Sequence, residues 1–322
     1  MSLLTSAAQN LASPAVLFFL LGVGASRLRS DLEVPPPVSK ALSLYLVFSI
    51  GFRGGSELAL GHGSLSLWVL LPLALGLAAS TVGVAFLLLR LLGGRVGMED
   101  RAAVAAHYGS VSVATFAAAT AYLGSQGLAA DGSLLVLLAA MEVPGILLAL
   151  SVGLRASQGR EGGLPWHELL TSAPLLLLMG SMAVGLLSGA KGQASLAPVV
   201  EGVFPGLLCL FLLDMGVVAG RRLNAFKEAG LRILAFGVAM PLLGGALGLL
   251  GAHLAGLDVA GRTLAAVLAG SASYIAAPAA VRQTLPGANL GLSLGLALGV
   301  TFPFNVLVGI PLWHALSLRL GA

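Results

Sequence analysis

Long apolar runs dominate this chain, and only 9% of its 322 residues are charged. A soluble domain carries roughly 25% charged residues, whereas a membrane span needs about 20 consecutive apolar ones. In lipid, apolar side chains can face outward while helices satisfy the backbone polar groups. We therefore predict an all-α integral membrane protein of ten transmembrane helices, at residues 13–27, 38–60, 65–91, 101–124, 132–154, 168–189, 201–221, 228–252, 261–285 and 289–316.

The basic residues between these runs predict the topology. If the N-terminus lies on side A, side-A segments hold Lys191, Arg262 and Arg319. Side-B segments hold most of the others, which are Arg27, Arg29, Lys40, Arg90, Arg95, Arg101, Arg155, Arg160, Arg221, Arg222, Lys227, Arg232 and Arg282. Because cytoplasmic loops carry the excess of Lys and Arg, we expect side B to be cytoplasmic and both termini to lie outside.

Charge and cysteine content exclude other classes. The net charge of +4 belongs to loops between spans, and basic and aromatic residues are not interleaved as in nucleic-acid-binding proteins, so no nucleic-acid partner is expected. Cys209 is the single cysteine, which excludes an intrachain disulfide and a cysteine-based metal or redox site. We expect no organic cofactor.

An internal repeat relates the two halves of the chain. Residues 101–115 and 262–276 both begin with Arg, continue with an Ala-rich turn and contain Gly-Ser-x-Ser, 161 residues apart. The spans that follow each contain a proline, Pro144 and Pro303. Five spans per repeat is an odd number, so the second half enters from the opposite side. We predict two inverted five-helix repeats, residues 1–160 and 161–322, as in secondary transporters.

The two motifs predict broken fourth and ninth helices. Glycine weakens a helix, and serine offers its backbone alternative hydrogen bonds. A break frees N–H groups at the start of the second half-helix, where the helix dipole also attracts an anion. We expect an anion site between the two breaks, formed by Gly109, Ser110, Val111, Ser112, Gly270, Ser271, Ala272 and Ser273. The alternative is that these small residues only allow close helix packing.

A carboxylate lies within the fifth predicted span. Glu142 precedes Pro144, and a buried carboxylate in a membrane is usually functional or paired. It could bind sodium, carry a proton or pair with Arg53. Sodium, a hard cation, suits oxygen ligands, so we predict a sodium site from Glu142, Thr115, Thr301 and Asn305.

Arg53 lies well inside the second predicted span, away from the connecting segments that hold the other basic residues. Glu57 lies four residues further along the same helix face, and Asp214 lies within the seventh span. A buried charge needs a partner, so we expect Arg53 to pair with one of these two acids. Direct contact of Arg53 with the substrate is the alternative.

Several segments together resemble one family. Residues 49–55 (Ser-Ile-Gly-Phe-Arg-Gly-Gly), the Gly-Ser-Val-Ser motif, residues 141–144 (Met-Glu-Val-Pro), residues 271–278 (Ser-Ala-Ser-Tyr-Ile-Ala-Ala-Pro) and residues 285–289 occur in the same order as in the sodium-dependent bicarbonate transporters first known from cyanobacteria. The resemblance covers nearly the whole chain, and residues 271–278 are its most specific part.

The resemblance implies a fold and an assembly. Members of that family have core and gate domains, each built from both repeats, and move by an elevator-like mechanism, usually as trimers in the bacterial inner membrane. Bicarbonate would lie between the broken helices with sodium alongside. A PII-like cytoplasmic regulator binds some members. The loop at residues 155–167 is shorter than in those members, so the resemblance does not decide this partner.

The function that follows is sodium-coupled import of bicarbonate, with sodium as the coupling ion. A proton- or sodium-coupled carrier or exchanger of another small anion, sulfate or a carboxylate, is the alternative. We do not expect an enzyme, because the sequence contains no nucleophile–base pair, paired aspartates or metal-ligand cluster. A channel is disfavoured because no filter-like sequence rich in charges or carbonyls is evident.

Overall fold

The computed structural model describes residues 11–61, 66–92, 96–156, 164, 166–222 and 231–320. These residues form helices and no strand. The helices of the first half are α2 (Pro14–Arg27), α3 (Pro36–Ala59), α4 (Leu67–Leu92), α5 (Met98–Gly109), α6 (Val113–Ser125), α7 (Leu134–Glu142) and α8 (Pro144–Ala156). Each predicted span of this half coincides with one helix or with one interrupted pair.

The second half contains more interruptions. It comprises α9 (Trp166–Leu170), α10 (Ala173–Ala197), the π-helix η1 (Pro198–Gly202), α11 (Phe204–Arg222), α13 (Leu231–Leu254), α14 (Val259–Ala269), α15 (Ala276–Thr284), α16 (Leu290–Gly295), η2 (Leu296–Thr301), α17 (Phe302–Phe304), η3 (Asn305–Gly309) and α18 (Ile310–Arg319). The predicted boundary between the halves, at residues 160 and 161, lies outside the described residues.

The helices are long and apolar enough for a membrane. Six described segments have the length and hydropathy of spans, among them Met98–Ser125 and Leu134–Arg155, which are each interrupted. Another of the six, Ala173–Arg221, runs through the sixth and seventh predicted spans, with a bend at Gly189 where φ is +53°. Pro14–Arg27 and Val259–Ala269 are shorter apolar helices. The chain is therefore built like a multi-pass membrane protein, and the count of ten spans stays a prediction.

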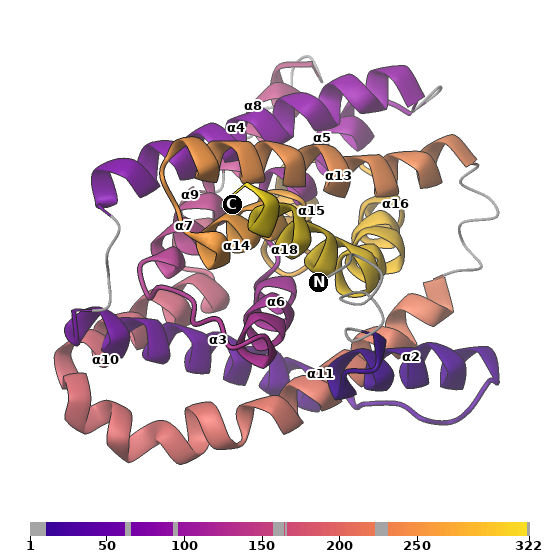
Figure 1. Ribbon diagram of the computed structural model, residues 1–322. Coiled ribbons are helices and arrows are strands. Elements are labelled where there is room, and N and C mark those ends of the chain that lie inside the picture. Colours follow the sequence, from indigo (N-terminus) through magenta and orange to yellow (C-terminus); the bar gives the residue numbers. More distant parts are fainter. Residues whose placement is uncertain are drawn as a thin grey trace.

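Two layers are visible in Figure 1, with α2, α3, α10 and α11 below and α4, α5, α8 and α13 above. We call α2, α3, α10 and α11 the lower layer. The upper layer consists of α4, α5, α7, α8 and α13 to α18. Helix α6 descends from the upper layer toward α3. One core cluster of buried side chains spans both layers and includes Phe19, Leu46, Phe116 and Phe302, whose contacts hold the layers together.

Close backbone contact joins the lower-layer helices in pairs. A Cβ on Gly216 of α11 would overlap the Phe19 carbonyl of α2, and a Cβ on Gly55 of α3 would overlap the Met182 carbonyl of α10. Small residues allow such approach in membrane helices. Toward the other end of the α2–α11 pair, Gly220 contacts Ser26, so the contacts advance in the same direction along both helices. These two helices therefore run parallel.

Candidate functional site

Both predicted breaks are present, and they touch each other. Helix α5 ends at Gly109 and α6 begins at Val113, whereas α14 ends at Ala269 and α15 begins at Ala276. We call residues 110–112 the first break and residues 270–275 the second break. The Ser112 N–H donates to Ser271 Oγ at 2.9 Å, and the Ser273 N–H donates to the His107 carbonyl at 2.7 Å. The chain thus brings the two motifs, distant in sequence, into direct contact.

The four serine hydroxyl groups play two different roles. Ser110 Oγ donates to the Glu142 carbonyl at 2.7 Å, and Ser271 Oγ donates to the Leu268 carbonyl at 2.8 Å. Ser112 Oγ instead accepts from the Thr115 N–H at 3.1 Å, and Ser273 Oγ accepts from the Ala277 N–H at 3.4 Å. A hydroxyl carries one hydrogen, so those of Ser110 and Ser271 are already used. The hydroxyls of Ser112 and Ser273 can still donate.

Helix ends supply further donors. Ser112 is the N-cap of α6 and has extended backbone angles, so the Val113 and Ala114 N–H groups lie in the first helical turn. Such groups have no partner within their own helix, and the helix dipole adds positive potential there. The break residues are almost inaccessible, with Ser112 and Ser273 each 3% exposed. An oxyanion held here would be surrounded by protein.

The remaining motif residues pack. A Cβ on Gly109 would overlap the Val82 side chain and one on Gly270 would lie 2.7 Å from the Pro241 carbonyl, so both glycines allow close helix contact. The Val111 and Ala272 side chains are buried in apolar clusters. Close packing, the alternative explanation of the motif, therefore applies to its glycine and apolar positions, while its serines make polar contacts.

The residues predicted for sodium lie around the breaks but do not bond to one another. Asn305 Nδ2 donates to the Gly270 carbonyl at 2.8 Å, which leaves its buried Oδ1 without a hydrogen-bond partner. The buried Glu142 Oε2 also has none. Thr301 Oγ1 donates to the Gly237 carbonyl at 2.8 Å. Within the described residues, no hydrogen bond joins the Glu142 carboxylate to Thr115, Thr301 or Asn305.

Arg53 has a partner that the sequence analysis did not include. Its Nε lies 3.9 Å from Glu201 Oε1 in the π-helix η1, which the chain folds back toward α3. Asp214 instead accepts a hydrogen bond from Ser39 Oγ. Helical spacing could not reveal the Arg53–Glu201 pair, because Glu201 lies almost 150 residues further along the chain. The expected pairing of Arg53 with Glu57 or Asp214 stays a prediction.

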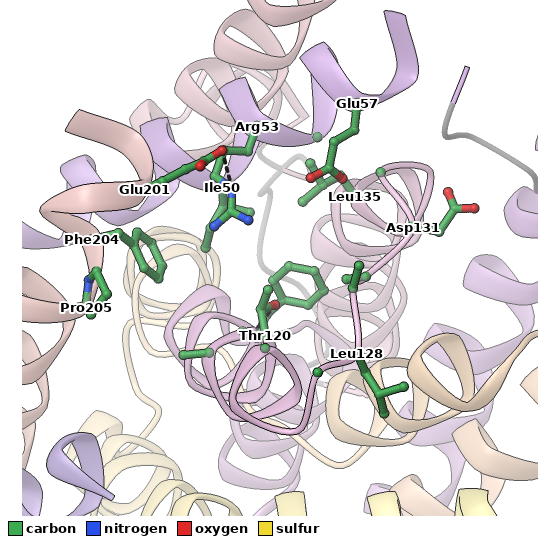
Figure 2. Close-up of a pocket in the computed structure, with 18 residues that line it drawn as sticks. Ile50, Arg53, Glu57, Thr120, Leu128, Asp131, Leu135, Glu201, Phe204 and Pro205 are labelled. Carbon is green, nitrogen blue, oxygen red and sulfur yellow. Dashed lines mark hydrogen bonds and ion pairs between the residues drawn. The ribbon is translucent and has the colours of Figure 1, made fainter. Parts of the chain in front are cut away.

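The Arg53–Glu201 pair lies in a cavity of about 490 Å³ between α3, α6, residues 127–132 and the start of α11. Figure 2 shows Glu57 and Asp131 across the cavity from this pair, with Thr120 on α6 along its lower edge. Phe116, one turn beyond the first break, also lines it. Three acidic residues and one arginine line this cavity, so it has an acidic lining next to the helix that carries the first break.

Sequence reasoning missed two residues that shape the site. Tyr108 OH lies 2.5 Å from Thr301 Oγ1 and so links the end of α5 to η2. Gly145, in the first turn of α8, packs so closely on the first break that a Cβ would overlap the Gly109 carbonyl. Tyr108 could have been found from the sequence, because it directly precedes the first motif. The Pro144–Gly145 pair signals a bend, but the packing partner of Gly145 is not readable from the sequence.

The family model for the Na+-dependent bicarbonate transporter superfamily matches residues 14–317. The match includes both breaks and all elements from α2 to nearly the end of α18. No curated protein matches the chain. The chain belongs to the Na+-dependent bicarbonate transporter superfamily, as its sequence motifs led us to expect, and is a membrane transport protein rather than an enzyme.

Proposed function

We propose that this member of the superfamily is a symporter that imports bicarbonate together with sodium by elevator-type alternating access. The observation that carries the proposal is the contact between the two helix breaks, Ser112 N–H to Ser271 Oγ and Ser273 N–H to the His107 carbonyl. Half-helix N-termini that meet within a bundle are a typical anion site of secondary transporters. The anion would be held by the N–H groups that begin α6 and α15 and by the hydroxyls of Ser112 and Ser273.

The arrangement of the lower layer supports the inverted repeat. The first helix of one half, α2, packs on the second helix of the other, α11, and α10 packs on α3 in the reciprocal combination. A two-fold rotation that exchanges the halves would convert one pair into the other. In this proposal the lower layer is the gate domain, and the upper layer together with α6 is the core domain that carries the anion across.

Sodium would bind beside the anion through oxygen ligands. Glu142 Oε2 and Asn305 Oδ1 are buried oxygens without hydrogen-bond partners, which is costly unless a ligand satisfies them. The Asn305 side chain is fixed on the second break through Gly270, and the Glu142 carbonyl is fixed on the first break through Ser110. Thr115 and Thr301 complete the proposed set. A sodium ion here would partly neutralise the anion while the core domain moves.

The acidic cavity would be the outward vestibule. Its lining residues Glu57, Asp131 and Glu201 would concentrate cations near α6. The positive charge of Arg53 would reduce the negative potential that an incoming anion meets. We further propose a trimer in a bacterial inner membrane with both termini outside. A PII-like regulator would have to bind the cytoplasmic connections, and residues 157–163 of the connection between the halves lie outside the described residues.

Uptake of labelled bicarbonate into proteoliposomes, with and without an inward sodium gradient, tests the proposal. We expect uptake to depend on the gradient, and the Glu142→Gln variant to lose most of this dependence because it removes a negative charge from the cation site. The Ser151→Ala variant is the control, since Ser151 only donates to the Leu147 carbonyl within α8. Equal uptake with and without sodium would contradict the coupling.

An anion competition series in the same assay distinguishes bicarbonate import from the alternative function, transport of sulfate or a carboxylate. Unlabelled bicarbonate should suppress the uptake of label, and sulfate and small carboxylates should do so at least ten-fold less effectively. Stronger competition by sulfate or a carboxylate would instead identify a carrier or exchanger of that anion, and a pH gradient that replaced the sodium gradient would make it proton-coupled.

A further inference from the structure

Tyr274 follows directly after the second serine motif and lies between the two layers. It is part of the second break, one residue beyond Ser273 and two before α15. Its ring packs edge-on against Phe302 with a centroid distance of 6.0 Å, and Phe302 packs edge-on against Phe19 of α2 at 5.9 Å. The phenol is therefore held in place by aromatic contacts that reach from the upper layer to the lower one.

The hydroxyl group of Tyr274 is buried and has no hydrogen-bond partner of good geometry. It lies close to the side chain of Ser112 in the first break and within electrostatic range of the Asp214 carboxylate on α11. A buried hydroxyl normally finds a partner. The surroundings thus place an unsatisfied hydroxyl group beside Ser112, at the contact of the two breaks.

The other groups at this contact offer mainly donors. The N–H groups that begin α6 are donors. The hydroxyls of Ser112 and Ser273 each already accept a backbone N–H, and their hydrogens remain available to donate. Bicarbonate has acceptor oxygens but also one O–H group, which needs an acceptor. The phenol of Tyr274 can donate and accept, and its oxygen has no hydrogen-bond partner, so it can accept from that O–H group while the Asp214 carboxylate attracts the phenol hydrogen.

We propose that Tyr274 is a further substrate-contacting residue, which accepts a hydrogen bond from the protonated oxygen of bicarbonate. This inference rests on the proposed function and adds selectivity to it. The site would favour singly protonated oxyanions over planar anions of similar size without an O–H group, such as nitrate. Asp214 would act as a positioning residue through the Tyr274 hydroxyl, from the opposite layer.

Thermal-shift titrations of the purified protein with bicarbonate and with nitrate, at fixed sodium and pH, test this role. The Tyr274→Phe variant should bind bicarbonate about ten-fold or more weakly, whereas its affinity for nitrate should change less than about three-fold, because nitrate makes no such hydrogen bond. Tyr122→Phe is the matched control. It also removes a buried phenol hydroxyl, which lies 3.2 Å from His314 Nδ1, but it lies ten residues along α6 from Ser112, about 15 Å away.

The outcomes separate the two proposals. Wild-type protein that does not bind bicarbonate overturns the proposed function itself. Wild-type binding that Tyr274→Phe leaves unchanged, or an equal loss for both anions in a folded variant, overturns the role of Tyr274 alone. If Tyr274→Phe does not fold, Asp214→Asn decides, because it removes the negative charge that orients the Tyr274 O–H and should therefore also lower the preference for bicarbonate over nitrate. An unchanged preference in Asp214→Asn then overturns the proposal.

Discussion

At the scale of single residues, the serines of the two motifs are not equivalent although their sequence pattern is the same. The hydroxyl groups of Ser110 and Ser271 donate to the backbone carbonyls of Glu142 and Leu268. Ser112 and Ser273 accept backbone N–H groups instead and keep their hydrogens. The first two therefore hold the breaks in shape, and the second two are the better candidates for contact with the anion.

Ser273→Ala should separate binding from stability. The bond that Ser273 Oγ accepts is long, 3.4 Å, so its loss should change the melting temperature little. Loss of a hydrogen bond to a charged ligand weakens binding by about 1.5–3 kcal/mol, so the bicarbonate dissociation constant should rise about ten-fold or more. Isothermal titration and thermal melting measure the two effects.

The comparison variant is Ser271→Ala, which removes the link between the Ser112 N–H and the Leu268 carbonyl. It should lower the melting temperature clearly more than Ser273→Ala does. A Ser273→Ala variant with wild-type affinity would exclude its hydroxyl as a ligand of the anion.

At the scale of elements, the first break depends on a glycine contact between helices. Gly109 at the end of α5 and Gly145 at the start of α8 meet backbone to backbone, and the interruption at Pro144 places the Glu142 carbonyl where Ser110 can reach it. Proline cannot continue the helical hydrogen-bond ladder, so the bend belongs to the sequence of this segment. The broken helix is thus supported by a second interrupted helix.

Gly145→Ala should push α8 away from the first break. A Cβ at this position would overlap the Gly109 carbonyl, and such overpacking costs about 1–3 kcal/mol. We expect a lower melting temperature and weaker bicarbonate binding in the same variant. The matched control is Gly76→Ala in α4, where a Cβ meets nothing within 4 Å, so the better helix propensity of alanine should leave the protein as stable or more stable. Equal melting temperatures of the two variants would contradict this account.

At the scale of the whole molecule, the break contact belongs to the upper layer plus α6, and α6 extends from there toward the lower layer (Figure 1). The lower-layer helices pair through backbone contacts at Gly216 and Gly55, which favours rigid bodies that move as units. The contacts between layers include side-chain contacts, such as Phe19 with Phe302. A sliding movement of one layer along the other would exchange these contacts and leave the helix pairs intact.

A cross-link between the layers should stop transport but not binding. Gly54 of α3 and Leu135 of α7 are in direct contact, since a Cβ on Gly54 would overlap the Leu135 side chain. Cysteines at these two positions, in a Cys209→Ser background, should be near enough to form a disulfide. Oxidation should abolish bicarbonate uptake into proteoliposomes, and a reductant should restore it. Full uptake by the verified disulfide form would argue against relative movement of the layers.

The sequence by itself determined the membrane class, the family, the positions of the first-half helices and the two breaks at the serine motifs. Lack of charge, helix-weakening Gly-Ser motifs and proline act locally, through hydropathy and backbone chemistry, so they are readable without a structure. Only the tertiary structure decided which groups meet. The pairing of Arg53 with Glu201, the packing of Gly145 on Gly109 and the place of Tyr274 beside Ser112 depend on how distant helices pack, and neither hydropathy nor helical spacing encodes those contacts.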